Sequence, residues 1–126
     1  MRLYRIERNG LGAFSSGLVS DAWWALDKEL DLFAEPDPLR HPTPWCDGPH
    51  LRDRFRRMEH FCAFKSTEQL LRWFDSEAHR RKMAELGGRV IVYEVSPKFV
   101  IEGNHQVVFE KAKAYKVDDI PIPTLT

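Results

Sequence analysis

Alternating apolar and polar positions predict short strands at the start of the chain and throughout its C-terminal half. Residues 2–7 alternate, with Tyr4 and Ile6 on one side, which is typical of a strand. After Gly88, turn residues separate the apolar segments RVIVYEV, KFVIE, QVVFE and AYKV. These segments predict strands of one antiparallel sheet. The tail, residues 118–126, has two prolines and little to pack, so we expect it to lie along the surface or fray.

Apolar residues at helical spacing predict two to four helices between these strands. Residues 20–33 predict one helix, and residues 51–58 have room for about two helical turns. A strand over residues 60–64 leads to Ser66, which has glutamine three residues later and so predicts a capping box. The helical pattern after this cap continues until Gly87 and its neighbouring glycine. Together the elements predict a small α+β fold.

A long loop and a basic helix face occupy the middle of the chain. Five of the eight prolines fall between residues 35 and 50, where they exclude a regular helix or a central strand. If the protein is an inhibitor, we expect this stiff loop and the adjoining arginines to bind its partner. The residues concerned are His41, Trp45, His50, Arg52, Arg54 and Arg56. The alternative is a solvated helix face that Asp53 and Glu59 partly neutralise.

Composition predicts one globular domain over residues 1–126. Apolar residues make up 43% of the chain and charged residues 30%, and the aromatic residues supply anchors for a core. Basic and acidic residues both number 19, so no net charge draws the protein to nucleic acid or a membrane. No apolar run reaches the ~20 residues that span a bilayer. The charged N-terminus differs from a signal peptide, and we expect the protein in the host cytoplasm.

The middle of the chain holds several potential metal ligands or nucleophiles, but their spacing favours neither role. They are His41, Cys46, His50, His60 and Cys62. Because no tight ligand pair such as C-x-x-C is present, we expect no metal. A Cys–His nucleophile pair is conceivable in the proline-rich loop, although nothing local lowers the thiol pKa. The arginines, with Trp45 and Phe55 as stacking surfaces, match no known nucleic-acid motif, so nucleic acid is not the partner we expect.

Three segments resemble the core of ADP-ribosyltransferase-like domains. They are L-Y-R at residues 3–5, F-K-S-T-E-Q-L at residues 64–70, and Q-V-V-F at residues 106–109 followed by A-Y-K-V-D-D-I at residues 114–120. The overall character of the chain, including R-H-P-T-P at residues 40–44, also resembles small uncharacterised proteins of phages and prophages. The resemblance implies an ADP-ribosyltransferase-like fold.

The same resemblance implies an NAD site. In that family an arginine grips the NAD phosphates, a Ser-Thr turn supports the nicotinamide ribose, and a late-strand glutamate binds the ribose hydroxyl. These roles fall on Arg5, on Ser66 with Thr67, and on Gln106, with Tyr4 beside the cofactor. Glutamine departs from the family pattern, because it brings no charge to the transition state, and one lost contact of this kind costs about 10²–10³ in rate.

Each implied role has a plainer alternative. Arg5 can pair with Glu7, Ser66 can act only as a helix cap, and Gln106 can be an ordinary strand residue. If the chain is an enzyme, Glu102 or Glu110 is a candidate for the missing carboxylate.

Two classes of function follow from the resemblance. In the first, the protein is phage-derived and binds or inhibits a host protein, such as a component of anti-phage defence, CRISPR systems included. In the second, it is a mono-ADP-ribosyltransferase that uses NAD to modify a host protein. Gln106 favours the first. A housekeeping binding protein with no relation to NAD is the third possibility.

Overall fold

The strands form two antiparallel sheets in the computed structural model, which describes residues 1–30, 44, 47–56 and 59–124. The larger sheet has the order β2-β1-β4-β7 and contains β1 (Arg2–Arg8), β2 (Leu11–Gly12), β4 (Arg89–Val95) and β7 (Ala114–Ile120). The smaller sheet has the order β3-β6-β5 and contains β3 (His60–Ala63), β5 (Val100–Glu102) and β6 (Val107–Glu110). The α+β class is therefore confirmed, with antiparallel strands and a strand-rich C-terminal half.

The prediction of a single sheet for the C-terminal strands is wrong. A 3-10 turn, η2 (Pro97–Phe99), takes the chain from β4 of the larger sheet to β5 of the smaller one. A second turn, η3 (Lys111–Lys113), returns the chain from β6 to β7. Strand periodicity predicts each strand but carries no information about which strands pair.

Among the residues that the structure describes, one isolated backbone bridge joins the two sheets. Tyr4 on β1 and Phe64, just after β3, exchange two hydrogen bonds of 2.8 Å each between their N–H and C=O groups. Leu3 and Phe109 are fully buried in the apolar cluster beside this bridge. The bridge therefore fixes β1 of one sheet against β3 of the other, and the cavity described below is built at this junction.

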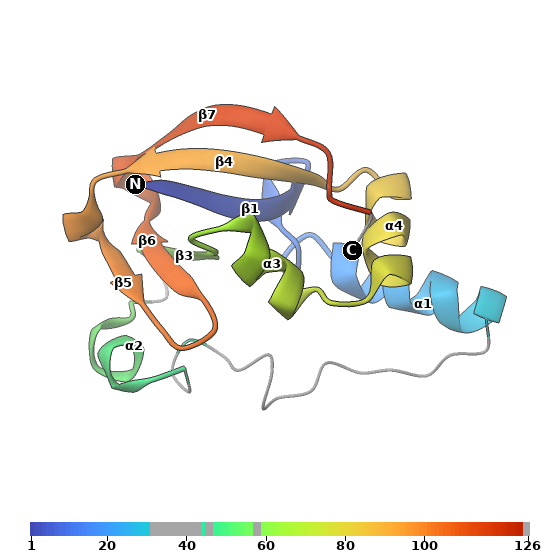
Figure 1. Cartoon of the computed structure of the whole chain (residues 1–126), viewed down its shortest axis with the longest axis horizontal. Helices are drawn as coiled ribbons and strands as arrows, with labels where there is room; N and C mark the ends of the chain where they lie inside the picture. The colour runs from blue at the N-terminus through green and yellow to red at the C-terminus, as the bar shows by residue number, and fades with distance from the viewer. Residues whose placement is uncertain (31–43, 45–46, 57–58, 125–126) are drawn as a thin grey trace.

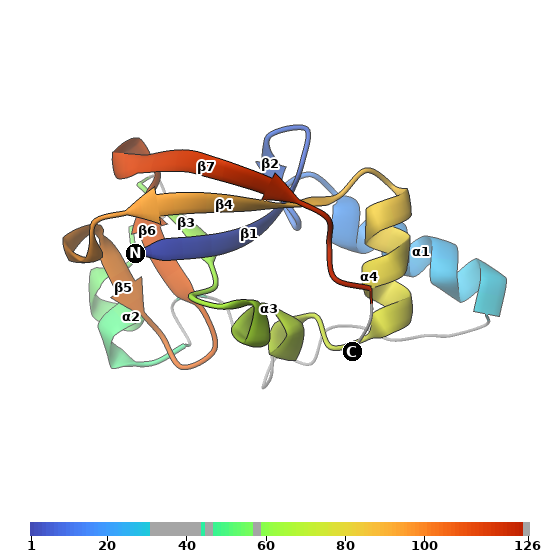
Figure 2. The same cartoon turned by 45° about the horizontal axis from the view of Figure 1, so that its top comes forward.

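Four helices complete the described fold. They are α1 (Leu18–Leu30), α2 (Pro49–Arg54), α3 (Thr67–Trp73) and α4 (Glu77–Glu85). Figures 1 and 2 show α1 and α4 packed together at one end of the larger sheet, with α2 beside β5 at the other end. The helix predicted over residues 20–33 begins at Leu18, and residues 31–33 lie outside the described residues.

Serine side chains begin both α3 and α4. The Gln69 N–H donates to Ser66 Oγ at 3.1 Å, which confirms the predicted cap, and the His79 N–H donates to Ser76 Oγ at 3.2 Å. The second cap starts a new helix where the apolar pattern alone predicts continuation. After α4, Gly87 has φ 93°, a conformation that glycine adopts without strain, so the predicted stop is confirmed.

The C-terminal tail contributes Ile122 to the core, which corrects the expectation that the whole tail lies along the surface or frays. Ile122 is 2% exposed and packs in the same apolar cluster as Leu18 and Val90. The fully buried Arg80 donates through Nε to the carbonyl oxygen of Pro123 at 2.8 Å. Pro121 and Pro123 have no backbone N–H groups, but this does not prevent the docking. The tail is held by the Ile122 side chain and by the Pro123 carbonyl, and neither contact needs an N–H donor from proline.

Candidate functional site

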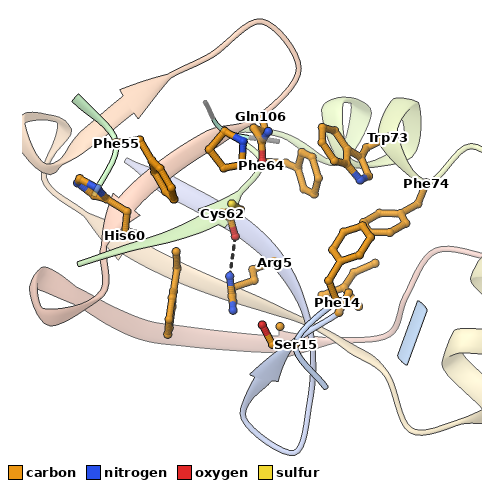
Figure 3. Close-up of a pocket in the computed structure, with 15 residues that line it drawn as sticks. Arg5, Phe14, Ser15, Phe55, His60, Cys62, Phe64, Trp73, Phe74 and Gln106 are labelled. Carbon is orange, nitrogen blue, oxygen red and sulfur yellow. Dashed lines mark hydrogen bonds between the residues drawn. The ribbon is translucent and has the colours of Figure 1, made fainter. Parts of the chain in front are cut away.

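An aromatic cavity of about 440 Å³ lies at the junction of the two sheets, between β1, β2, β3 and α3 (Figure 3). Six phenylalanine and tryptophan rings contribute to its walls: Phe14, Phe55, Phe61, Phe64, Trp73 and Phe74. The volume is in the range of small-molecule sites in proteins. Sequence reasoning does not predict this cavity, because its rings come from four separate stretches of the chain, and their spacing predicts only local core positions.

Arg5 extends from β1 into one wall of the cavity and is already bound by two groups. Its Nε donates to Glu7 Oε2 at 3.0 Å, and its Nη1 donates to the Cys62 carbonyl oxygen at 2.8 Å (Figure 3). The guanidinium carbon lies 4.2 Å from the centre of the Phe61 ring. The side chain is only 10% exposed. The alternative that Arg5 pairs with Glu7 is therefore confirmed, and its role in gripping phosphates stays a prediction.

Two ionisable groups beside Arg5 are held in their neutral forms. Burial raises the pKa of the Cys62 thiol to about 11, although the nearby Arg5 charge opposes this rise. Burial also raises the pKa of Tyr93, and its hydrogen bond to Glu7 at 2.5 Å raises it further. Neither group is a nucleophile or base near neutral pH, since both reactions need the deprotonated form.

The predicted Ser-Thr turn lies outside the cavity lining. Ser66 Oγ is occupied by the cap of α3, and Thr67 is the first residue of that helix. The Gln69 side chain does not complete the predicted capping box at Ser66, because its Oε1 accepts from the Lys65 N–H at 2.8 Å. Tyr4 contributes backbone bonds to the bridge between the sheets and is likewise absent from the described lining.

Gln106 is the second predicted residue that lines the cavity with Arg5. It is 2% exposed and immediately precedes β6. The two residues lie on different sheets, because Arg5 belongs to the larger sheet and Gln106 adjoins the smaller one. They meet because the bridge at Tyr4 and Phe64 brings the two sheets together.

A buried carboxylate, which sequence reasoning missed, anchors the chain just before α2. Asp47 is 1% exposed and accepts from the backbone N–H groups of His105 and Gln106, each at 3.0 Å. The ring Nδ1 of His105 lies 2.7 Å from Asp47 Oδ1. Gly103 permits this approach, because a Cβ there would lie 2.5 Å from Asp47 Oδ2. The partners are 58 and 59 residues away, so no local signal indicates them.

The predicted partner-binding residues that the structure describes lie on and beside α2. His50, Arg52, Arg54 and Arg56 are exposed. We call these four residues the arginine face. His41 and Trp45 lie outside the described residues, as does most of the proline-rich loop. The helix predicted over residues 51–58 begins at Pro49 and ends at Arg54, because the next residue, Phe55, has an extended backbone.

A polar hollow of about 320 Å³ adjoins the arginine face. Its basic side chains are Arg54, Arg56 and Lys98, and its acidic ones are Asp53, Glu59 and Glu110. His60 Nδ1 accepts from the Arg56 N–H at 2.9 Å and is thereby occupied. Within the part of the chain that the structure describes, no three His, Cys, Asp or Glu residues are arranged to hold a metal ion. No described helix has the length and apolar character needed to cross a membrane.

Comparison with known proteins identifies the family but not an activity. The chain is 40% identical over 65 residues to an uncharacterized 19.7 kDa protein encoded in the motB-dexA intergenic region of Enterobacteria phage T4. The match covers 52% of this chain and only 38% of that protein. No solved structure matches the fold. Residues 1–123 match the family described as Bacteriophage T4 Y00F protein. The chain therefore belongs to the bacteriophage T4 Y00F protein family.

Proposed function

We propose that this phage protein binds a host protein, such as a component of anti-phage defence, through the arginine face and without catalysis. The observation that carries the proposal is the placement of exposed arginines on a helix whose inner side is fixed to the fold. Leu51 is fully buried and Phe55 is 7% exposed, both in one apolar cluster with Ile101 and Val108. The bonds to Asp47 hold the start of the helix.

This anchoring supports binding because it lowers the entropy lost when a complex forms. Arginine is also among the residue types most often found at interface hot spots. Within the described residues, no ion pair joins Arg54 to an acidic side chain, and the pair between Arg52 and Asp53 is exposed and 3.4 Å long. Such exposed pairs contribute about 0–1 kcal/mol, so they compete weakly with a partner. The charge of the arginine face favours a partner with an acidic surface.

Mono-ADP-ribosyl transfer is the second candidate, and its support is the shared lining of the cavity by Arg5 and Gln106. The contacts of the implied residues favour the binding proposal instead. Arg5 is bound by Glu7 and the Cys62 carbonyl, and Ser66 is occupied as a cap. On the binding proposal, wild type shows no NAD turnover. The enzyme hypothesis would be established if wild type transferred ADP-ribose efficiently and a folded Arg5→Ala variant did not.

Gln106→Glu separates a degenerate NAD site from a site that never bound NAD. If the cavity has kept an NAD site, the substitution restores some NAD hydrolysis, because it returns a carboxylate to the place where positive charge develops on the ribose. If neither protein binds or consumes NAD in calorimetry and turnover assays, the resemblance to ADP-ribosyltransferases does not extend to function.

Affinity capture from nuclease-treated host lysate tests the binding proposal. The immobilised proteins are wild type, Arg54→Glu and a matched control, Arg72→Glu, which reverses another exposed arginine, on α3. We expect a host protein, identified by mass spectrometry, to be retained by wild type and the control and lost from Arg54→Glu. Equal retention by all three folded proteins would exclude the arginine face, and loss of all bound material after nuclease treatment would indicate nucleic acid.

A further inference from the structure

We infer that the aromatic cavity binds a small, uncharged, planar aromatic molecule that carries a hydrogen-bond acceptor. This inference does not depend on the proposed partner, because it concerns the junction of the two sheets and not the arginine face. Three properties of the described lining carry it: its aromatic rings, a donor on the lining residue Arg5 that has no described acceptor, and the charge balance around that donor.

The rings line the cavity with aromatic faces and edges. Phe64 lies 5.6 Å from Trp73 and 6.0 Å from Phe74, measured between ring centroids, with interplanar angles of 55° and 80°. Phe14 stacks on Phe74 at 6.3 Å and is itself 55% exposed. Figure 3 shows Phe14 and Ser15 on the same side of the cavity, and Ser15 is also exposed. Aromatic pairs prefer offset-stacked or edge-to-face arrangements, so an additional flat ring gains contacts at each wall.

Arg5 supplies the polar contact. Its Nε and Nη1 are bound to Glu7 and to the Cys62 carbonyl, and no described group accepts from Nη2. Nη2 lies close against Gly12, another lining residue, where a Cβ would collide with it. A ligand carbonyl at this position would accept a charge-assisted hydrogen bond from a guanidinium whose orientation is already fixed on two sides. A ligand without an acceptor would leave this donor without a partner.

The ion pair with Glu7 makes the site favour a neutral ligand over an anion. Glu7 is 7% exposed, so its negative charge is little screened by water and offsets the positive charge of Arg5. An anionic ligand would lose its hydration on entering the cavity and meet a pair with no net charge in return. A neutral acceptor avoids this cost and still gains the bond to Nη2. The same pair makes the cavity a poor site for a phosphate.

Calorimetry with two probes of equal shape tests this inference. The probes are naphthalene-2-carboxamide, which is neutral, and naphthalene-2-carboxylate, which is anionic. We expect wild type to bind the carboxamide at least about tenfold more tightly than the carboxylate, a difference of about 1.4 kcal/mol. Glu7→Gln keeps an acceptor for Arg5 and Tyr93 but removes the charge, so it should raise the affinity for the carboxylate at least about tenfold.

Two tryptophan substitutions locate the probe without altering the buried ion pair. Ser15→Trp places a bulky side chain on an exposed lining position and should abolish binding of the carboxamide. Ser20→Trp makes the same change on the exposed side of α1, away from the lining, and should leave the affinity within about twofold of wild type. Thermal melting establishes that each variant is folded.

Three outcomes would overturn the inference. The first is that wild type binds neither probe, which would leave the cavity to another occupant such as a side chain of a partner protein. The second is that wild type binds the carboxylate as tightly as the carboxamide, which would contradict the effect of Glu7. The third is that folded Ser15→Trp and Ser20→Trp bind equally well, which would place the probe outside the cavity.

Discussion

Asp47 shows how one buried carboxylate positions a whole surface. It accepts from two backbone N–H groups and lies 2.7 Å from the His105 ring, all across the gap between the start of α2 and the β5–β6 hairpin. Asp47→Ala leaves these donors without their acceptor, so we expect it to lower the free energy of unfolding by about 2–3 kcal/mol. Urea unfolding measures the change. The exposed Asp53→Ala is the control, and we expect it to change stability by less than about 0.5 kcal/mol.

The Cys62 thiol gives a prediction that depends on pH. Its pKa of about 11, against an ordinary value of 9.0, reduces the thiolate fraction at pH 8 by about a hundredfold. In a Cys46→Ala background, alkylation of the folded protein should be slower than that of the urea-unfolded protein by this factor. The rate should rise about tenfold per pH unit from pH 8 to pH 10, because only the thiolate reacts. A rate that levels off near pH 9 would show that burial does not protect the thiol.

At the scale of elements, substitutions at the two serine caps test whether Ser66 serves helix capping or ligand binding. Ser66→Ala and Ser76→Ala each remove an acceptor from the first turn of a helix, so each should cost about 1 kcal/mol of stability. Ser66→Asp should keep most of the stability, since aspartate is an equally good cap. Thermal melts compare these variants with the control Ser15→Ala, because Ser15 caps none of the described helices. If Ser66→Ala left stability unchanged, the cap would not be the reason for serine at this position.

Sequence patterns predict elements better here than they predict pairing. The cap at Ser66 and the helix stop at Gly87 are encoded within a few residues and are confirmed. The cap at Ser76 is equally local, but the continuous apolar spacing on both sides obscured it. The division into two sheets depends on η2, η3 and the bridge at Tyr4, and these join segments far apart in the chain. No window of sequence contains that information.

At the scale of the whole molecule, the tail closes the core that α1, α4 and β4 share. Ile122 is 2% exposed within this cluster, so Ile122→Ala should lower stability by about 2–4 kcal/mol, as expected for a large buried side chain. Leu11 is 54% exposed, and Leu11→Ala should change stability by less than about 0.5 kcal/mol. Urea unfolding of both variants measures these two changes in the free energy of unfolding. Equal effects would mean that the tail frays in solution.

The candidate sites show the same limit of sequence reasoning. Arg5 and Gln106 do line one cavity, but the aromatic rings around them come from distant segments and were not predicted. The sequence indicates the pairing of Arg5 with Glu7 as an alternative, because the two residues lie on the same side of one strand. It does not indicate the anchor at Asp47, because the partners of this carboxylate are in a hairpin far along the chain. Periodicity places residues on a face, whereas a site requires knowing which faces meet.

The central claim is that the arginine face binds an acidic surface of a host protein, and a titration of the captured, purified partner tests it most directly. The proteins compared are wild type, Arg54→Glu and Arg72→Glu, at two salt concentrations. We predict that Arg54→Glu weakens binding at least about tenfold and lessens its salt dependence, because a charge that faces the partner is reversed. Arg72→Glu should stay within about twofold of wild type. Equal affinities for all three folded proteins would contradict the account.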